Sequence, residues 1–291
     1  RRVHPSVDGA GALAMGAEAD AERHARELGA CGVTFLPLPP GTLDQAVAIF
    51  EHIAADVLAD QGERMHFEPP DAWPPLPRLC RRLLPYLPVR QLSFFVGDQG
   101  ETDEGDDEFL RYANAARPET LAELAAPFEG LLEPLARRLF GPRERVVAVN
   151  AQYIFGSAKS ETEAHQDFLS RNTVSLLAPL YDYAPEEASL HYWRFDENPA
   201  LYRTGDPAAA ELRRTYAYRR GEAVVFSGDL FHQTVPFQRP AQGWGSKQCR
   251  ALVCLVLVAA DSLLAEEGYE AVLRNLRGPA GGYLVDPATE E

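Results

Sequence analysis

The sequence predicts a mainly β protein with flanking helices, in which a jelly-roll core follows a helical N-terminal region. Two observations support this fold class. Before residue 145 the strongest apolar patterns repeat with a helical period, whereas between 146 and 259 short β-rich runs alternate with turns. No internal repeat or linker divides the 291 residues. We therefore expect a single domain, with a mostly helical buttress at 1–145, the β core at 146–259 and a C-terminal helix and tail at 260–291.

The N-terminal region combines three longer helical patterns, a short one near 78–84 and two short β-rich runs. The longer helices are expected at 17–29, which ends at a glycine, at 42–60, which begins at the capping residue Thr42, and at 118–140, which has the longest apolar stripe. Strands are expected at 33–36 and 91–96, and an acidic loop, most simply a solvated one, at 98–108.

The core is expected to contain seven strands separated by turns. Each run is rich in β-branched and aromatic residues, and together they cover 146–155, 173–181, 189–195, 215–218, 222–226, 231–235 and 250–258. Many short strands of this kind are typical of a jelly roll of the cupin type. A longer polar insertion at 196–214 interrupts the series.

Composition and charge exclude several classes of partner. The net charge of −15 argues against nucleic acid and against an anionic membrane surface, because both need clustered Lys and Arg. The longest apolar run, 251–260, is too short to cross a bilayer. No apolar leader is visible in residues 1–30, and the cysteines show no paired spacing, so we expect a cytoplasmic location. Nothing in the pattern predicts an oligomeric state.

Three residues with metal-binding side chains stand out. His165 and Asp167 lie two apart, so in a strand they would share one face, and His232 follows a later β-rich run and a tight turn. Two imidazoles and one carboxylate on one side of an ion suit Fe(II) and leave positions open for substrate and dioxygen. Asp229 is a rival carboxylate, although its place in the turn favours a backbone hydrogen bond.

Arg250 opens a strand that is apolar on both faces. A guanidinium is costly to bury at such a place without an anion, and its planar fork matches a carboxylate. The alternative is that the side chain extends from the strand end to solvent.

The order of these four residues resembles the Fe(II)/2-oxoglutarate-dependent dioxygenases, and is most similar to the phytanoyl-CoA hydroxylase-like small-molecule hydroxylases. The resemblance covers residues 146–259 and rests on His165, Asp167, His232 and Arg250. It implies a double-stranded β-helix core, Fe(II) held by the first three residues, and 2-oxoglutarate held by the iron and by Arg250, with Thr234 assisting.

The resemblance also implies an activity. Dioxygen and 2-oxoglutarate would be consumed to oxidise an unactivated C–H bond of a small molecule, such as an amino acid, a peptide or a natural-product intermediate. In the related iron halogenases a small residue replaces the acidic ligand and leaves room for chloride. Asp167 fills that position here, which favours hydroxylation or another oxidation over halogenation.

Weaker candidates lie on two core strands. Asn150 and Gln152 share one face of the first core strand and Tyr153 lies on the other, so one set is expected to face the cavity and contact cosubstrate or substrate. His191 and Trp193 share a face on a later strand and are candidates for the substrate pocket. Ordinary packing explains these residues equally well.

Two other functions remain open at this stage. The protein could be a cupin-type metal oxygenase that does not consume 2-oxoglutarate, in which case Arg250 would bind a substrate carboxylate. It could also be a catalytically inactive jelly-roll binding protein. Metal content tests the inactive binding protein, and succinate release tests the oxygenase that does not consume 2-oxoglutarate.

Overall fold

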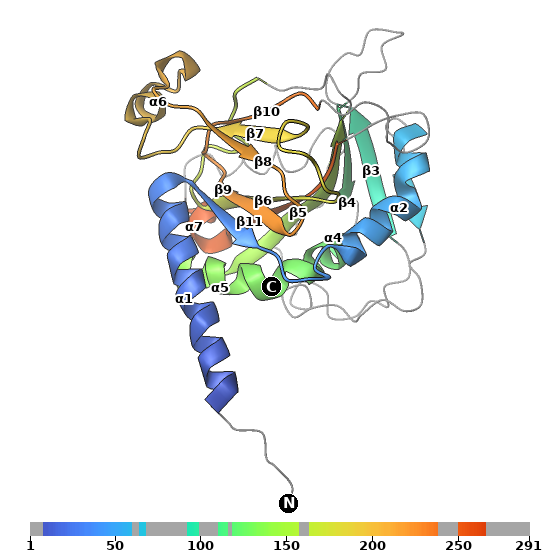
Figure 1. The fold of residues 1–291 in the computed structure, drawn as a ribbon, viewed down its shortest axis with the longest axis horizontal. Coiled ribbons are helices and arrows are strands. Elements are labelled where there is room, and N and C mark those ends of the chain that lie inside the picture. The colour runs from blue at the N-terminus through green and yellow to red at the C-terminus, as the bar shows by residue number, and fades with distance from the viewer. Residues whose placement is uncertain are drawn as a thin grey trace, which may run out of the picture.

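Within the described residues, the strands form two antiparallel sheets (Figure 1). The computed structural model describes residues 8–59, 64–67, 92–98, 110–115, 118–156, 163–237 and 250–265. The large sheet has eight strands in the order β1 (Val33–Pro37), β9 (Glu222–Ser227), β6 (Thr173–Pro179), β11 (Arg250–Ala259), β5 (Val146–Gly156), β4 (Leu110–Ala115), β3 (Leu92–Asp98) and β2 (Arg64–Phe67). The small sheet has three, in the order β10 (His232–Thr234), β7 (Ser189–Tyr192) and β8 (Arg214–Ala217). The seven expected core strands are therefore confirmed.

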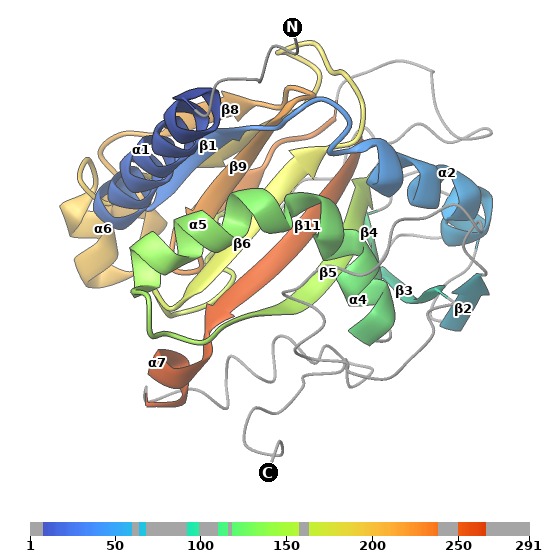
Figure 2. The same cartoon turned by 90° about the horizontal axis from the view of Figure 1, so that it is seen from below.

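Helices cover the outer face of the large sheet. Figure 2 shows α1 (Asp8–Cys31), α5 (Glu129–Phe140) and α4 (Pro118–Ala125) crossing that face, with α2 (Asp44–Ala59) toward the β2 side. Two short helices, α6 (Pro199–Thr204) and the 3-10 turn η2 (Pro207–Ala209), lie in the insertion that precedes β8, and α7 (Ala260–Leu264) follows β11. The short helix expected near 78–84, the rest of the expected C-terminal helix and most of the acidic loop at 98–108 lie outside the described residues.

The single helix expected at 118–140 is wrong. A 3-10 turn, η1 (Ala126–Phe128), separates α4 from α5. Pro127 lies inside this turn. Proline has no backbone N–H and disfavours the α conformation of the residue before it, so a regular helix is interrupted there.

The N-terminal region contributes more β structure than its sequence predicts. β1 pairs with β9, while β4, β3 and β2 extend the large sheet beyond β5. β2 and β4 were not predicted, because β2 has only four residues and β4 contains Asn and Ala, which are depleted in strands. The expected helical buttress is therefore also one end of the main sheet.

Both faces of the large sheet are packed, and β11 shows this most clearly. Along β11, Ala251, Val253 and Leu255 belong to the core on the helix side, whereas Leu252 and Cys254 belong to the core that faces the small sheet. All ten residues of β11 are buried. Burial on both faces explains why this strand is a continuous apolar run in the sequence. None of the helices within the described ranges is long and apolar enough to span a membrane.

Candidate metal centre

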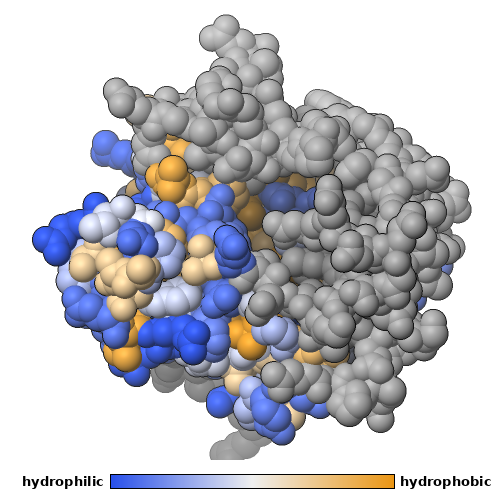
Figure 3. Space-filling model, turned by 90° about the horizontal axis from the view of Figure 1, so that it is seen from above, coloured by the Kyte–Doolittle hydropathy of each residue, from blue (hydrophilic) through white to orange (hydrophobic). Residues whose placement is uncertain are grey.

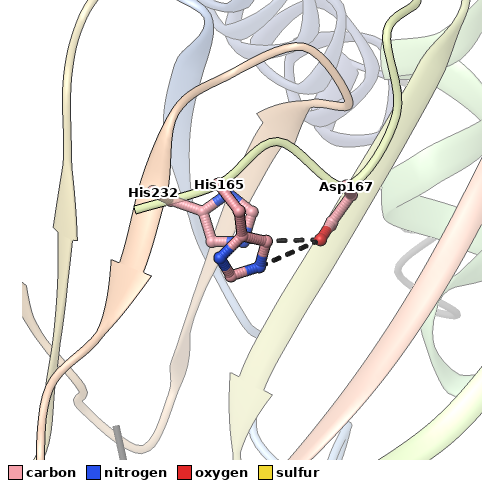
Figure 4. A group of neighbouring side chains, drawn as sticks. All are labelled: His165, Asp167 and His232. Carbon is pink, nitrogen blue, oxygen red and sulfur yellow. Dashed lines mark ion pairs between the residues drawn. The ribbon is translucent and has the colours of Figure 1, made fainter. Parts of the chain in front are cut away.

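Three side chains with metal-binding atoms converge between the two sheets (Figure 4). His165 and Asp167 come from the segment before β6, and His232 is the first residue of β10. One ligand atom from each lies within 4.8 Å of the others. Asp167 Oδ1 is 3.8 Å from His165 Nε2 and 3.4 Å from His232 Nε2. Within the part of the chain that the structure describes, this is the one such group of three or more residues.

The backbone brings the two histidines together. His165 N–H donates to the carbonyl of His232, and His232 N–H donates to the carbonyl of His165, both at 2.9 Å. This pair forms an isolated antiparallel bridge, and neither His165 nor Asp167 lies in a regular strand. The ring centroids consequently lie 4.4 Å apart.

Hydrogen bonds orient the ligand atoms toward one another. His165 Nδ1 lies 2.7 Å from the carbonyl oxygen of Glu163, and His232 Nδ1 lies 3.0 Å from that of Leu230. A carbonyl only accepts, so both Nδ1 atoms carry the proton and both Nε2 lone pairs are available to a metal. Ser175 Oγ donates to Asp167 Oδ2 at 2.9 Å, which leaves Oδ1 facing the two Nε2 atoms.

The three groups also shift one another's pKa. Burial tends to raise the pKa of Asp167, but His232, His165 and the Ser175 hydroxyl outweigh it and hold this pKa below its ordinary value. Burial opposes charge on His232, yet the Asp167 carboxylate raises the pKa of His232 above 6.5. Burial and the adjacent His232 lower the pKa of His165. The Asp167 carboxylate and the His232 imidazole thus each favour the other's charged form, so protonation of His232 would compete with metal binding.

The site is open on one side. The side chain of His165 is 41% exposed and that of Asp167 30%, whereas that of His232 is 6% exposed. The Phe226 ring packs against His232 with centroids 4.7 Å apart. The face above the small sheet is hollowed near its middle, and hydrophobic residues show in the hollow beside polar ones (Figure 3). An ion or ligand would approach His232 past His165.

Asp229, the rival carboxylate, is not part of this group. Its Oδ1 accepts a hydrogen bond from Ser227 Oγ at 2.5 Å, and its Oδ2 pairs with Arg171 Nε at 3.1 Å. Both oxygens are thus engaged by the turn and by a neighbouring cation.

Arg250 is fully buried, so the alternative that its side chain reaches solvent is wrong. Its Nη1 donates to the carbonyl of Val235 at 2.9 Å. Its Nε and Nη2 are also buried and have no hydrogen-bond partner among the described residues. In the pairing of β11 with β5, Arg250 lies opposite Gly156, which has no side chain to fill the space beside it. A buried guanidinium with two unused donors matches an anionic ligand, and a carboxylate in particular.

Three carboxamides lie on the sheet face that Arg250 shares. Gln152 pairs with Cys254 and Asn150 with Val256, so both face the small sheet. Asn114 of β4 lies opposite Gln152 and adds a third carboxamide that sequence analysis missed, because β4 itself was not predicted. Thr234 lies two residues after His232 on β10 and pairs with Leu190, a residue of the core between the sheets.

Three other sequence candidates, which were expected to contact substrate, lie away from the three metal-binding side chains. Tyr153 is buried on the helix side of the large sheet, where its hydroxyl donates to the carbonyl of Ala46 at 2.8 Å. His191 alternates on β7 with Tyr192, which faces the space between the sheets, so His191 points outward. His191 Nδ1 lies 2.9 Å from the Thr215 hydroxyl oxygen, and Trp193 packs in a separate cluster with Leu201 and Phe231.

Two further residues belong to the site but were not singled out from sequence. Ser175 holds Asp167, and nothing distinguishes a serine in a predicted strand from any other. Tyr112 of β4 shares the inner face, and burial raises its pKa, with smaller electrostatic effects from Asp167, Arg250 and Cys254. Tyr112 pairs with Ile154 of β5, which packs against the core between the sheets, so its side chain lies on the face that Arg250 shares.

Comparison with protein-family models gives no match, and no curated protein matches the sequence. Among solved structures, the chain is similar to the non-heme alpha ketoglutarate dependent epimerase SnoN from nogalamycin biosynthesis, with a TM-score of 0.54 and 14% identity over 83% of this chain and 84% of that one. SnoN in complex with Fe3+, alpha ketoglutarate and nogalamycin RO gives a TM-score of 0.52 and 12% identity over the same shares. This similarity shows that the chain has the fold of SnoN.

Proposed function

We propose that the protein is a non-haem Fe(II)/2-oxoglutarate-dependent dioxygenase that hydroxylates, or otherwise oxidises, an unactivated C–H bond of a small molecule. One observation carries the proposal. The free ligand atoms of His165, Asp167 and His232 face one another between the sheets. Arg250, which is buried with two unused donors on the inner face of the large sheet, supports the proposal. A fold shared with an enzyme described as alpha ketoglutarate dependent supports it.

Iron would be held by His165 Nε2, His232 Nε2 and Asp167 Oδ1. This set of two imidazoles and one carboxylate suits Fe(II) and leaves coordination positions for other ligands. Bound iron would supply the activation of dioxygen that oxidation of a C–H bond requires. The chain's own contribution is orientation, because each ligand is hydrogen-bonded on the side away from the shared space.

2-Oxoglutarate would be held at its far carboxylate by Arg250. The two unused donors, Nε and Nη2, form one edge of the guanidinium fork and fit the two oxygens of a carboxylate. Thr234 is proposed to add a hydrogen bond to this carboxylate. Asn150 and Gln152 are proposed to contact the cosubstrate or the substrate from the adjoining strand, since they face the same side of the sheet.

The substrate is proposed to be a small molecule such as an amino acid, a peptide or a natural-product intermediate. The inner surface around the polar groups is apolar and buried, with Leu252, Val256 and Phe226 among its residues. Such a surface keeps water away from the reacting bond. The substrate would enter beside His165, the most exposed of the three ligands.

Anaerobic titration tests the proposal. Fe(II) is added first and 2-oxoglutarate second, while visible charge-transfer absorption of an iron–2-oxo acid chelate is followed. We expect one iron per chain and absorption only when both are present, and then succinate release on admission of dioxygen. A chain that binds no metal would be a catalytically inactive binding protein. Metal binding without 2-oxoglutarate binding or succinate release would indicate an oxygenase of another cosubstrate class.

A further inference from the structure

The two segments that carry the metal ligands are joined by contacts that involve no metal. The first ligand segment is residues 163–173 and the second is residues 227–234. Besides the reciprocal bonds between His165 and His232, Phe168 N–H donates to the carbonyl of Gly228 at 2.9 Å, and Gly228 N–H donates to that of Thr173 at 2.8 Å. The backbones are therefore paired along both segments.

The side chain of Gln166 completes this connection at the metal centre. Gln166 stands between the ligands His165 and Asp167. Its Nε2 donates to the backbone carbonyl of Asp229 at 2.6 Å, and the bond is partly buried. Because Gln166 is covalently joined to both ligands, a bond that fixes its side chain limits the movement of His165 and Asp167 relative to His232.

The segments pack so closely that a side chain would not fit at Gly228. A Cβ atom there would lie 1.8 Å from Thr173 Oγ1 and 3.0 Å from Phe168 Cβ. The Thr173 hydroxyl is itself held by the carbonyl of Ser170 at 2.8 Å and cannot easily move aside. Because of this close packing, the folded chain itself fixes how the two segments lie relative to each other, without a metal.

We propose that Gln166 is a positioning residue, whose hydrogen bond to the Asp229 carbonyl holds the two ligand segments in register before a metal arrives. The inference rests on the proposed metal site and adds to it a preformed state of the metal-free protein. Without the bond, the conformational entropy that is lost when the ligands become ordered would oppose metal binding. Loss of a group that orients metal ligands typically lowers metal affinity about 10- to 100-fold.

The test compares Gln166→Met with Arg171→Met. Methionine is as long as glutamine and has no donor, so Gln166→Met removes the bond to the Asp229 carbonyl with little change in volume. Arg171→Met is the matched control, because it removes a second link to Asp229, an ion pair from an arginine side chain that is 62% exposed. Exposed pairs contribute little.

Two readouts are needed, and neither is catalytic activity. Co(II) is titrated into the metal-free proteins and its visible spectrum recorded, and backbone hydrogen exchange is measured at His165 and His232 without metal. We expect Gln166→Met to bind Co(II) about 10- to 100-fold more weakly, with an altered spectrum, and to exchange faster at both amides. Arg171→Met should match the wild type in both measurements.

The outcomes separate this inference from the proposed function. Equal affinity and equal exchange in Gln166→Met and the wild type would overturn the positioning role while leaving the metal site intact. An equal loss in Arg171→Met would overturn it too, because any loosening of the turn would then have the same effect. A wild type that binds no Co(II) would refute the metal site, and with it the metal-binding purpose of the contact.

Discussion

The burial of Arg250 predicts opposite changes in stability and in cosubstrate binding when the guanidinium is removed. Arg250→Met keeps a long apolar side chain and deletes the charged group. In the wild type, Nε and Nη2 are buried without a partner among the described residues, and each such group costs about 1–3 kcal/mol. The substitution also loses the bond from Nη1 to the Val235 carbonyl, which costs about as much as one unsatisfied group.

The sum of these contributions makes the folded, metal-free variant more stable than the wild type. Two unsatisfied donors are removed and one acceptor is left, so we expect the free energy of unfolding of the metal-free protein to rise by about 1–3 kcal/mol. For a chain of this size that corresponds to roughly 2–5 °C in Tm. 2-Oxoglutarate affinity should fall about 30- to 1000-fold, since a charge-assisted bidentate contact contributes about 2–4 kcal/mol.

Urea unfolding of the metal-free proteins measures the first quantity, and anaerobic titration of the iron-loaded proteins with 2-oxoglutarate measures the second. Arg171→Met serves as the control, because it deletes an exposed guanidinium and should change neither. An Arg250→Met protein that is less stable than the wild type would refute the claim that these donors lack partners. Unchanged 2-oxoglutarate affinity would assign the carboxylate to another cation.

Three further predictions follow from the triad. The double variant His165→Ala, His232→Ala should lose stoichiometric Fe(II) in an anaerobic titration, and an unchanged stoichiometry would exclude these ligands. In the metal-free protein, the pKa of His232 is raised above 6.5 and that of Asp167 lowered below 3.8, so their pairing stabilises the fold between these pH values. That stabilisation is lost as pH rises through the raised pKa of His232 or falls through the lowered pKa of Asp167. The Tm of the wild type should therefore exceed that of Asp167→Asn by the largest amount near pH 5–6. A Tm difference that grew above pH 7 would contradict the pairing. Metal affinity should instead rise above pH 6, because His232 loses its proton there. Finally, because Asp167 occupies the third ligand position, the wild type in chloride buffer should yield oxidised and never chlorinated product, and a chlorinated product in the mass spectrum would show that Asp167 is not a ligand.

The sequence singles out the three side chains that converge between the sheets, because few residue types bind iron and because short-range spacing limits how they can meet. His165 and Asp167 are two apart, and the turn before His232 is visible as Gly228-Asp229. Arg250 is predictable for a related reason, since a single cation at the head of an apolar strand needs a physical explanation.

The faces of the other strands could not be predicted, because they depend on register. His232 pairs with Tyr192, which turns Tyr192 inward and His191 outward, and a shift of one residue would reverse both. Asn114 depends on tertiary context as well, since β4 forms by pairing with β5 in spite of its weak intrinsic preference for a strand. Ser175 acquires its partner only when the segment before β6 folds back over that strand.

The uneven exposure of the three ligands affects how the protein would acquire its metal. His232 lies beneath Phe226 with a side chain 6% exposed, while His165 is 41% exposed. An ion bound by the triad could thus be loaded or extracted by a chelator through the His165 side without unfolding the chain. Loading would then be a competition among the ions available after synthesis, in which Cu²⁺, Ni²⁺ and Zn²⁺ bind such sites more tightly than Fe²⁺. The metal content of a purified preparation would consequently report its growth medium as much as the selectivity of the site.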